Sequence, residues 1–197
     1  MPKTALQNAL IREKRKNAIM ETALKQFALK GIDNISIDDI AQAMHISHGL
    51  FYHYFTDKTD LINAIIEKGK ETIGKSVSEL INNNVGGKDF VEELTKFYLS
   101  NIQASDSKAY YIYILLSLNL QKTTSIENNW NISYHPYFVK SIEIEQEKGV
   151  FTNLPASELI TVYFSALEGL AYSRIKYKKT FALPSVETLL NIFYKKA

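Results

Sequence analysis

Residues that interrupt helices are scarce in this chain, and they fall between stretches that have helical periodicity. The 197 residues include only four prolines and eight glycines. These lie mainly between segments in which apolar residues recur every three or four positions. No pair of alternating runs is joined by Asn-Gly or Asp-Gly, the pattern typical of a β-hairpin. The sequence therefore predicts an all-α fold of about nine helices.

Capping residues and periodicity together place these helices along the chain. Ser36, Ser47 and Asp57 are expected N-caps, and Gly31 is the expected end of the first helix. A polar stretch at 121–131 is predicted to be a loop. The expected helices cover about residues 14–30, a short segment after Ser36, 48–55, 57–81, 88–104, 107–120, 133–148, 156–178 and a last segment from Pro184.

Composition excludes several classes of protein. The chain contains no cysteine, which excludes disulfides, iron–sulfur clusters, cysteine zinc sites and thiol nucleophiles. Charged residues make up 22% and hydrophobic residues 46%, as in a soluble globular protein. The most apolar run, Tyr110 to Leu120, is about half as long as a membrane span requires. With no secretory signal apparent, we expect a cytoplasmic chain without a membrane partner.

The small excess of positive charge lies near the amino terminus. Residues 1–70 contain 10 Lys and Arg against 8 Asp and Glu, whereas residues 71–197 contain 13 of each. A basic segment ahead of a helix can neutralise phosphates in or beside a DNA groove. The alternative is a solvated, frayed terminus. Most of the excess comes from Lys3, Arg12, Lys14, Arg15 and Lys16.

The segment from Ser36 to Lys58 has the pattern of a helix-turn-helix motif. Two short helices are joined by a tight connection at His45-Ile46. At about 100° per residue, Phe51 and Phe55 share one side of the second of these helices. Both rings are therefore expected to be buried against the preceding helices.

The rest of that second helix carries small or hydrogen-bonding groups. Gly49, Leu50 and His53 point away from the buried side, and Tyr52 and Tyr54 project from the two flanks. Such a helix suits the DNA major groove, where outward residues meet base edges and flanking hydroxyls meet the phosphates. Its amino-terminal N–H groups also point toward phosphate.

At these residues the chain resembles the TetR family of transcriptional regulators. The stretch IDDIAQAMHISHGLFYHYFTDK, residues 37–58, has its capping serine, glycine, tyrosine, aromatic and lysine residues at the family's spacing. Beyond it, only the turn at 147–151 and the step at 168–170 are similar. The resemblance implies a three-helix DNA-binding domain at 1–58 and a helical ligand-binding and dimerisation domain at 59–197.

The resemblance also implies roles for individual residues. The residues implied to face bases are His48, Gly49, Leu50 and His53. The residues implied to hold phosphates are Ser36, Ser47, Tyr52, Tyr54 and Lys58.

Three residues depart from the family pattern. His45 stands where a turn glycine is usual, and histidine tolerates positive φ better than most residues. Leu50 replaces a common threonine, which leaves apolar contact, for example with a thymine methyl group. Tyr54 replaces a common histidine but keeps a hydrogen-bond donor, so we expect a similar phosphate contact.

The segment 88–181 is rich in aromatic residues, most of which are expected in the core. Helix bundles also build ligand pockets between helices, and the resemblance implies that this is the inducer domain. Glu168 is either a counter-ion for a cationic ligand or a dimer contact. The pocket is expected to use some of Tyr98, Tyr110, Tyr113, Tyr134, Tyr137 and Phe164.

The apolar stripes on the last two expected helices, at 156–178 and after Pro184, predict a homodimer. Two such helices from each subunit would form a four-helix bundle around a two-fold axis. The DNA-binding domains of the two subunits would then contact half-sites of a palindromic operator that lie about 34–36 Å apart, or a multiple of that distance. The expected interface residues are Leu159, Val162, Ala166, Gly169, Leu170, Leu189 and Phe193.

Alternative functions have less support in the sequence. His45, His48 and His53 lie close together in sequence, but no acidic residue at ligand spacing completes a metal site, so we expect neither a metal nor a cofactor. No phosphate-binding loop or catalytic motif is present, so we do not expect an enzyme. The favoured function is a repressor released from its operator by a small apolar or aromatic molecule. A helical protein-interaction module and an all-α small-molecule enzyme are the alternatives.

Overall fold

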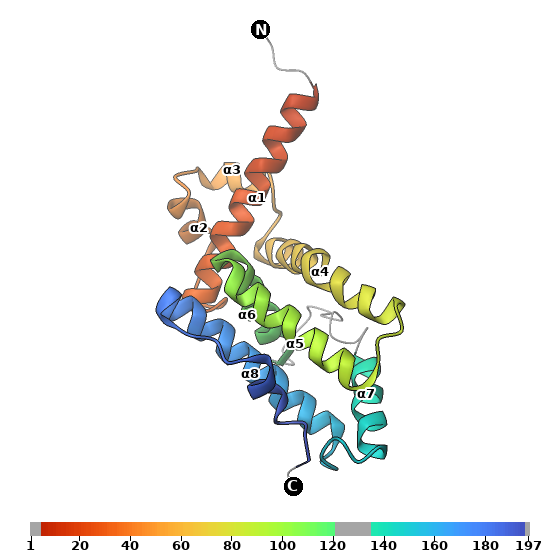
Figure 1. Cartoon of the computed structure of the whole chain (residues 1–197). Coiled ribbons are helices and arrows are strands. Elements are labelled where there is room, and N and C mark those ends of the chain that lie inside the picture. The colour runs from red at the N-terminus through yellow and green to blue at the C-terminus, as the bar shows by residue number, and fades with distance from the viewer. Residues whose placement is uncertain (1–4, 121–134, 196–197) are drawn as a thin grey trace. The chain divides into compact units, whose positions relative to one another are not determined.

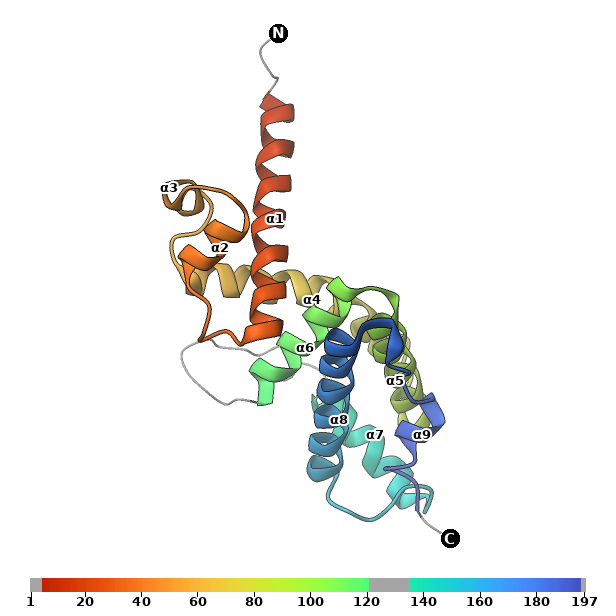
Figure 2. The same cartoon turned by 90° about the vertical axis from the view of Figure 1, so that its left-hand side faces the viewer.

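A computed structural model describes residues 5–120 and 135–195 (Figures 1 and 2). The chain divides into two compact units, Met1–Glu67 and Lys68–Ala197. Within the described residues the regular structure is helical and includes no strand, which confirms the expected all-α fold. Lys3, Tyr134 and the loop expected at 121–131 lie outside the described residues.

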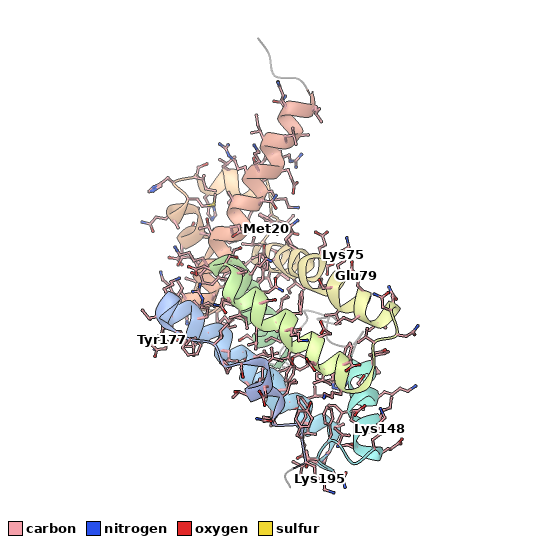
Figure 3. The ribbon with its side chains drawn as sticks, in the orientation of Figure 1. Met20, Lys75, Glu79, Lys148, Tyr177 and Lys195 are labelled. Atoms are coloured by element: carbon pink, nitrogen blue, oxygen red, sulfur yellow. The ribbon has the colours of Figure 1, made fainter. Side chains whose placement is uncertain are left out.

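The amino-terminal unit is built from three helices and the start of a fourth. These are α1 (Ala5–Lys30), α2 (Ile37–Ala43), α3 (His48–Tyr52) and the first part of α4 (Lys58–Asn82). The apolar face of α1 is buried, with Met20, labelled in Figure 3, among its residues, and α1 contacts α2, which in turn contacts α3. Gly31 ends α1 at φ +87, and its N–H donates to the carbonyl of Phe27 at 2.8 Å. The core residues of this unit include Ile19, Ala23, Leu24, Phe27, Ile35, Ile40, Phe51, Phe55, Leu61 and Ile65.

Two helices of this unit differ from the sequence-based expectation. The first helix begins at Ala5 rather than near Lys14, because its early residues are good helix formers although they have no buried face. Consequently Arg12, Lys14, Arg15 and Lys16 belong to a helix and not to a segment that precedes one. The third helix ends at Tyr52, short of Phe55. After it, the N–H of Tyr54 donates to the carbonyl of Phe51 at 2.9 Å, so the backbone tightens into a turn.

The carboxy-terminal unit is a helical bundle. It contains α5 (Gly87–Ala104), α6 (Asp106–Leu120), α7 (His135–Glu147), α8 (Ala156–Tyr177), a 3₁₀ turn (Lys178–Thr180) and α9 (Val186–Leu190). The main pairs are α6 with α8 and α5 with α7 (Figures 1 and 2). The last helix starts after its N-cap Ser185 rather than at Pro184. No described helix is long and apolar enough to cross a membrane.

Aromatic rings fill the centre of this bundle. The ring of Phe138 lies 5.8 Å from that of Phe90, 5.4 Å from that of Tyr163 and 6.1 Å from that of Phe193. The hydroxyl of Tyr163 is 3.1 Å from the hydroxyl of Thr95, which bonds the backbone in turn. Burial raises the pKa of Tyr163 well above its ordinary value, so this hydroxyl stays neutral. The rings fix the relative positions of α5, α7, α8 and the turn that follows α9.

Candidate nucleic-acid interface

A capping box sets the start of α2. The hydroxyl of Ser36 accepts a hydrogen bond from the N–H of Asp39 at 3.1 Å, and the Asp39 carboxylate accepts one from the N–H of Ser36 at 2.8 Å. The carboxylate also accepts from the Ser36 hydroxyl. These bonds, with smaller contributions from the charges of Lys30 and Lys58, lower the pKa of Asp39. The Ser36 side chain therefore holds the helix end in place, and its phosphate contact stays a prediction.

The turn between α2 and α3 is a Schellman motif centred on His45. His45 has φ +53, and its N–H donates to the carbonyl of Gln42 at 3.1 Å. The N–H of Ile46 donates to the carbonyl of Ala41 at 3.0 Å, the second bond of the motif. Histidine thus adopts the conformation usually left to glycine, as the sequence predicted. The turn fixes where α3 begins.

The buried side of α3 is the one that the sequence predicted. Ser47 caps the helix by accepting a hydrogen bond from the N–H of Leu50 at 3.2 Å. Phe51 and Phe55 are both buried, with their rings 5.8 Å apart. Because these rings anchor one side of the helix, the opposite side faces solvent. A Cβ added to Gly49 there would meet nothing within 4 Å.

The residues predicted to face DNA differ in their solvent exposure on the outward surface. His48, Gly49 and His53 are exposed, whereas Leu50 is half-buried. Tyr52 is 46% exposed and Tyr54 is half-buried. Among the described residues, neither of these two phenol hydroxyls has a hydrogen-bond partner, so both are available to phosphate.

Lys58 begins α4 beside this surface. Its Nζ lies 5.9 Å from the centre of the Phe27 ring, which places the charge over the aromatic face. The side chain is half-buried, so its aliphatic part packs while its ammonium group stays accessible. Its contact with phosphate stays a prediction, as do the DNA contacts of the other outward residues.

Three contacts at this surface were not predicted. Nε2 of His48 lies 3.1 Å from Oδ1 of Asp38, and the His48 ring meets the Tyr52 ring edge-on at 4.8 Å. From α1, Nζ of Lys16 lies 5.5 Å from the centre of the Phe55 ring, which brings a cation beside the end of α3. The His48–Asp38 and Lys16–Phe55 contacts have no signal in the sequence, because each joins residues of different segments, whereas His48 and Tyr52 are four residues apart on α3. Together they position His48 and Tyr52 and add positive charge.

The residues predicted to line a ligand pocket lie in separate places in the carboxy-terminal unit. Tyr98 and Phe164 are buried, with ring centres 6.2 Å apart, and belong to the aromatic core around Phe138. Tyr137 joins this core through Phe90, and its hydroxyl donates to the Val85 carbonyl at 2.7 Å. Tyr110 and Tyr113, on α6, instead contact residues of α8 and the 3₁₀ turn: Tyr110 meets Lys178 and Tyr113 meets Tyr172. Tyr98, Phe164 and Tyr137 thus join the aromatic core, whereas Tyr110 and Tyr113 contact α8 and the 3₁₀ turn.

The residues predicted for a dimer interface divide into two sets. Leu159, Leu189 and Phe193 fill the core of the single chain, because their side chains pack inside the bundle. These three side chains are therefore part of the core and are not available to a dimer interface, contrary to the prediction. Val162 is 55% exposed and Gly169 is open, while Ala166 and Leu170 are half-buried. This second set forms a surface stripe on α8.

Histidines and carboxylates do not gather into a metal site in the part of the chain that the structure describes. His48 pairs with the single carboxylate of Asp38. Glu168, considered as a counter-ion, accepts a hydrogen bond from the Ser117 hydroxyl at 2.7 Å.

The capped helices, the Schellman turn and the exposed face of α3 define a helix-turn-helix DNA-binding domain. The model of the family described as "Bacterial regulatory proteins, tetR family" matches residues 19–65, which cover these elements. Residues 19–65 are thus similar to the DNA-binding domain of the TetR family, and the chain is a DNA-binding transcriptional regulator.

Similar proteins extend this relationship over most of the chain. The biofilm operon icaADBC HTH-type negative transcriptional regulator IcaR of Staphylococcus epidermidis is 25% identical over 189 residues, which cover 92% of this chain and all of IcaR.

Solved structures share the fold. The ketosteroid transcriptional regulator KstR2 of Mycobacterium tuberculosis has a TM-score of 0.66 at 14% identity and covers 92% of this chain and 96% of its own. AibR, in complex with isovaleryl coenzyme A and operator DNA, also has a TM-score of 0.66, at 18% identity, and covers 90% of this chain and 94% of its own.

Proposed function

We propose that this regulator is a homodimeric repressor that binds a palindromic operator and is released from it by a small molecule with an apolar or aromatic body. The observation that carries the DNA-binding part is the outward face of α3. There, Gly49 is open and His53 is exposed, and the hydroxyls of Tyr52 and Tyr54 have no partner among the described residues. Repression is supported by the similarity to IcaR, whose name describes a negative regulator.

The ligand-responsive part is supported by the helical bundle and by AibR, which was solved with both a coenzyme A ester and operator DNA. In this proposal, a ligand in the carboxy-terminal unit favours one arrangement of the bundle. In this proposal the shift reaches the DNA-binding unit of each subunit through α4, whose residues belong partly to one unit and partly to the other. Operator affinity then falls by the ratio of the ligand's affinities for the two states.

Replacement of both tyrosines by phenylalanine tests the DNA contact. A duplex that the wild-type protein prefers is first selected from a random pool, and binding is then measured by fluorescence anisotropy. Removing two phosphate hydrogen bonds from each subunit should weaken binding by at least about tenfold. In Tyr52→Phe with Tyr54→Phe, the loss should be similar for the selected and the scrambled duplex, because phosphate contacts carry no sequence information.

The matched control is Tyr177→Phe, which removes an exposed hydroxyl at the end of α8. It should leave DNA binding unchanged. If the double variant binds both duplexes as tightly as wild type, the two tyrosines do not hold phosphates. If the wild-type protein selects no duplex from the pool, the proposed recognition surface is wrong.

A further inference from the structure

The last turn of α8 buries a charged side chain. Arg174 is only 7% exposed, and its Nη1 donates to Oδ1 of Asp106 at 3.1 Å. A guanidinium group has five N–H donors. No other side-chain hydrogen bond of Arg174 is found within the described residues, so most of its guanidinium donors are left without a protein acceptor. A buried cation in this condition is costly unless an anion or another acceptor reaches it.

The neighbouring charges do not compensate Arg174. Nζ of Lys178 lies 2.9 Å from the other oxygen of Asp106 and 3.2 Å from the hydroxyl of Tyr110. The hydrogen bond from Lys178 and the charges of Lys178 and Arg174 lower the pKa of Asp106, and Asp106 raises the pKa of Lys178. At neutral pH one carboxylate is therefore shared by two cations. The cluster keeps one positive charge in excess.

A pocket opens beside this cluster. It has a volume of about 280 Å³ and is lined by Gln103, Arg174, Phe181 and Leu183. These residues come from the end of α5, the end of α8 and the segment that leads to α9 (Figure 2). Tyr177 marks this end of α8 in Figure 3. The lining thus combines a buried guanidinium and an amide with an aromatic ring and an aliphatic side chain.

This combination selects a ligand by two features. A planar guanidinium pairs with a carboxylate through two parallel hydrogen bonds, and its charge excludes cationic ligands. Phe181 and Leu183 are both half-buried and offer apolar surface to the rest of the molecule. The volume limits that molecule to a small size.

We propose that this pocket binds a small monocarboxylate with an apolar body, its carboxylate on Arg174 and its body against Phe181 and Leu183. The proposal names a chemical class for the effector, and in that respect it rests on the proposed function. Binding itself does not depend on whether the protein is a repressor. Of the residues predicted to line a pocket, Tyr110 lies at the edge of this cluster through its contact with Lys178.

Calorimetry and thermal melting of the full chain test the binding step. The probes are sodium benzoate and sodium hexanoate, with benzyl alcohol and 1-hexanol as uncharged partners and sodium chloride at the same ionic strength. For molecules of this size we expect saturable carboxylate binding with a Kd of about 10 µM to 1 mM. Both carboxylates should raise the melting temperature, and the alcohols and chloride should do so much less.

Three variants locate the site. Arg174→Gln should weaken carboxylate binding by at least about tenfold. Arg174→Lys keeps the charge if the first variant does not fold, and it should also bind more weakly because the paired hydrogen bonds are lost. Lys176→Gln removes an exposed cation from the same helix and should bind as wild type does. Equal binding of carboxylates and alcohols, an effect reproduced by chloride, or full binding by both Arg174 variants would overturn the proposal.

Operator binding in the presence of benzoate separates this proposal from the repressor function. Release of the operator by a carboxylate, abolished in Arg174→Gln, supports both. Saturable binding without any change in operator affinity supports the site and contradicts its role as the effector pocket. A protein that binds its operator but takes up neither carboxylate contradicts the site and leaves DNA recognition intact.

Discussion

Gly49 is the residue at which the DNA surface can be changed with the least effect on the fold. A Cβ at this position meets nothing within 4 Å, and the backbone there is helical. Alanine also has a higher helix propensity than glycine, by about 1 kcal/mol. Any loss of DNA binding on substitution would therefore come from the DNA side of the surface.

For Gly49→Ala we predict an unchanged or slightly higher melting temperature together with weaker binding to the selected duplex. The added methyl group would meet the base edges that the open position now admits. Circular dichroism measures the first quantity and fluorescence anisotropy the second. Wild-type affinity in a stable variant would show that Gly49 does not approach the bases.

Two other glycines allow the cost of backbone strain to be distinguished from the cost of a steric clash. Gly149 has φ +73 with open space around it, whereas Gly87 has φ +58 and a Cβ there would lie 2.5 Å from Oε1 of Glu145. Glu145 is buried and bonded to Lys148 at 2.7 Å, so it has little room to move.

We predict that Gly149→Ala lowers the free energy of unfolding by about 1 kcal/mol, from strain alone. Gly87→Ala should cost more, about 2 to 3 kcal/mol, because strain and a clash act together. Chemical denaturation of both variants gives the comparison. Equal losses would mean that the Glu145 side chain moves aside freely.

At the scale of helices, Ser36 has two roles that can be separated. Its hydroxyl caps α2 through Asp39, and it is also predicted to reach phosphate. Ser36→Ala should destabilise the protein by about 1 kcal/mol through the lost cap, whereas Ser36→Asn should restore the cap. If the hydroxyl also binds phosphate, Ser36→Asn will regain stability but not DNA affinity. Denaturation measures the stability and fluorescence anisotropy the DNA affinity. If Ser36→Asn recovers both, capping is the only role of the Ser36 hydroxyl.

The link between α6 and α8 predicts a dependence of stability on pH. Pairing with Lys178 and Arg174 lowers the pKa of Asp106 below its ordinary 3.8. The native state therefore favours the carboxylate. This stabilisation is fully present above about pH 4 and is lost as the pH falls through the lowered pKa.

Asp106→Asn should accordingly lower the free energy of unfolding at pH 7 by about 1 kcal/mol, since Asp106 is half-exposed although Arg174 is buried. The difference from wild type should shrink at pH 3. Asp89→Asn, which removes an exposed carboxylate from the first turn of α5, is the control. Urea denaturation at the two pH values checks the prediction, and a difference that is equal at both would refute the linkage.

The helices also show what the sequence can and cannot predict. The sequence placed α4 and α5 within a residue of their observed ends, because both helices have an apolar face, Asp57 caps α4, and Gly86 precedes α5. The start of α1 was missed because its first turns bury nothing. The inward side of α3 followed from the spacing of Phe51 and Phe55.

Contacts between distant residues set the limit of the sequence-based prediction. Aromatic residues at helical spacing look alike in a core and in a pocket, so the core positions of Tyr98 and Phe164 could not be told from pocket positions. Arg174 and Asp106 are 68 residues apart, and nothing in the local pattern of either points to the other. The core positions of Leu159 and Phe193 likewise depend on how the bundle closes.

For the whole molecule, the exposed stripe on α8 makes the dimer testable. Val162 lies on the stripe at 55% exposure, and Leu154, in the turn before α8, is 54% exposed. The two positions therefore differ in location but not in solvent exposure.

We predict that Val162→Lys shifts the protein toward monomer in analytical ultracentrifugation, because a charge at a buried contact between copies is costly. Binding to a two-half-site duplex should weaken with it. Leu154→Lys should leave both unchanged. A fully dimeric Val162→Lys variant would place the interface elsewhere.

The early turns of α1 and the absence of native thiols have a joint consequence for spectroscopy. From Ala5 to the first buried residue, Ile19, the helix extends about 20 Å at 1.5 Å per residue. Leu6, 72% exposed on this projecting rod, can be replaced by cysteine and labelled with a nitroxide without background from any other sulfhydryl group. In an assembly of two copies, double electron–electron resonance spectroscopy would measure the distance between the two labels, and so the separation of the two DNA-binding units, with and without effector.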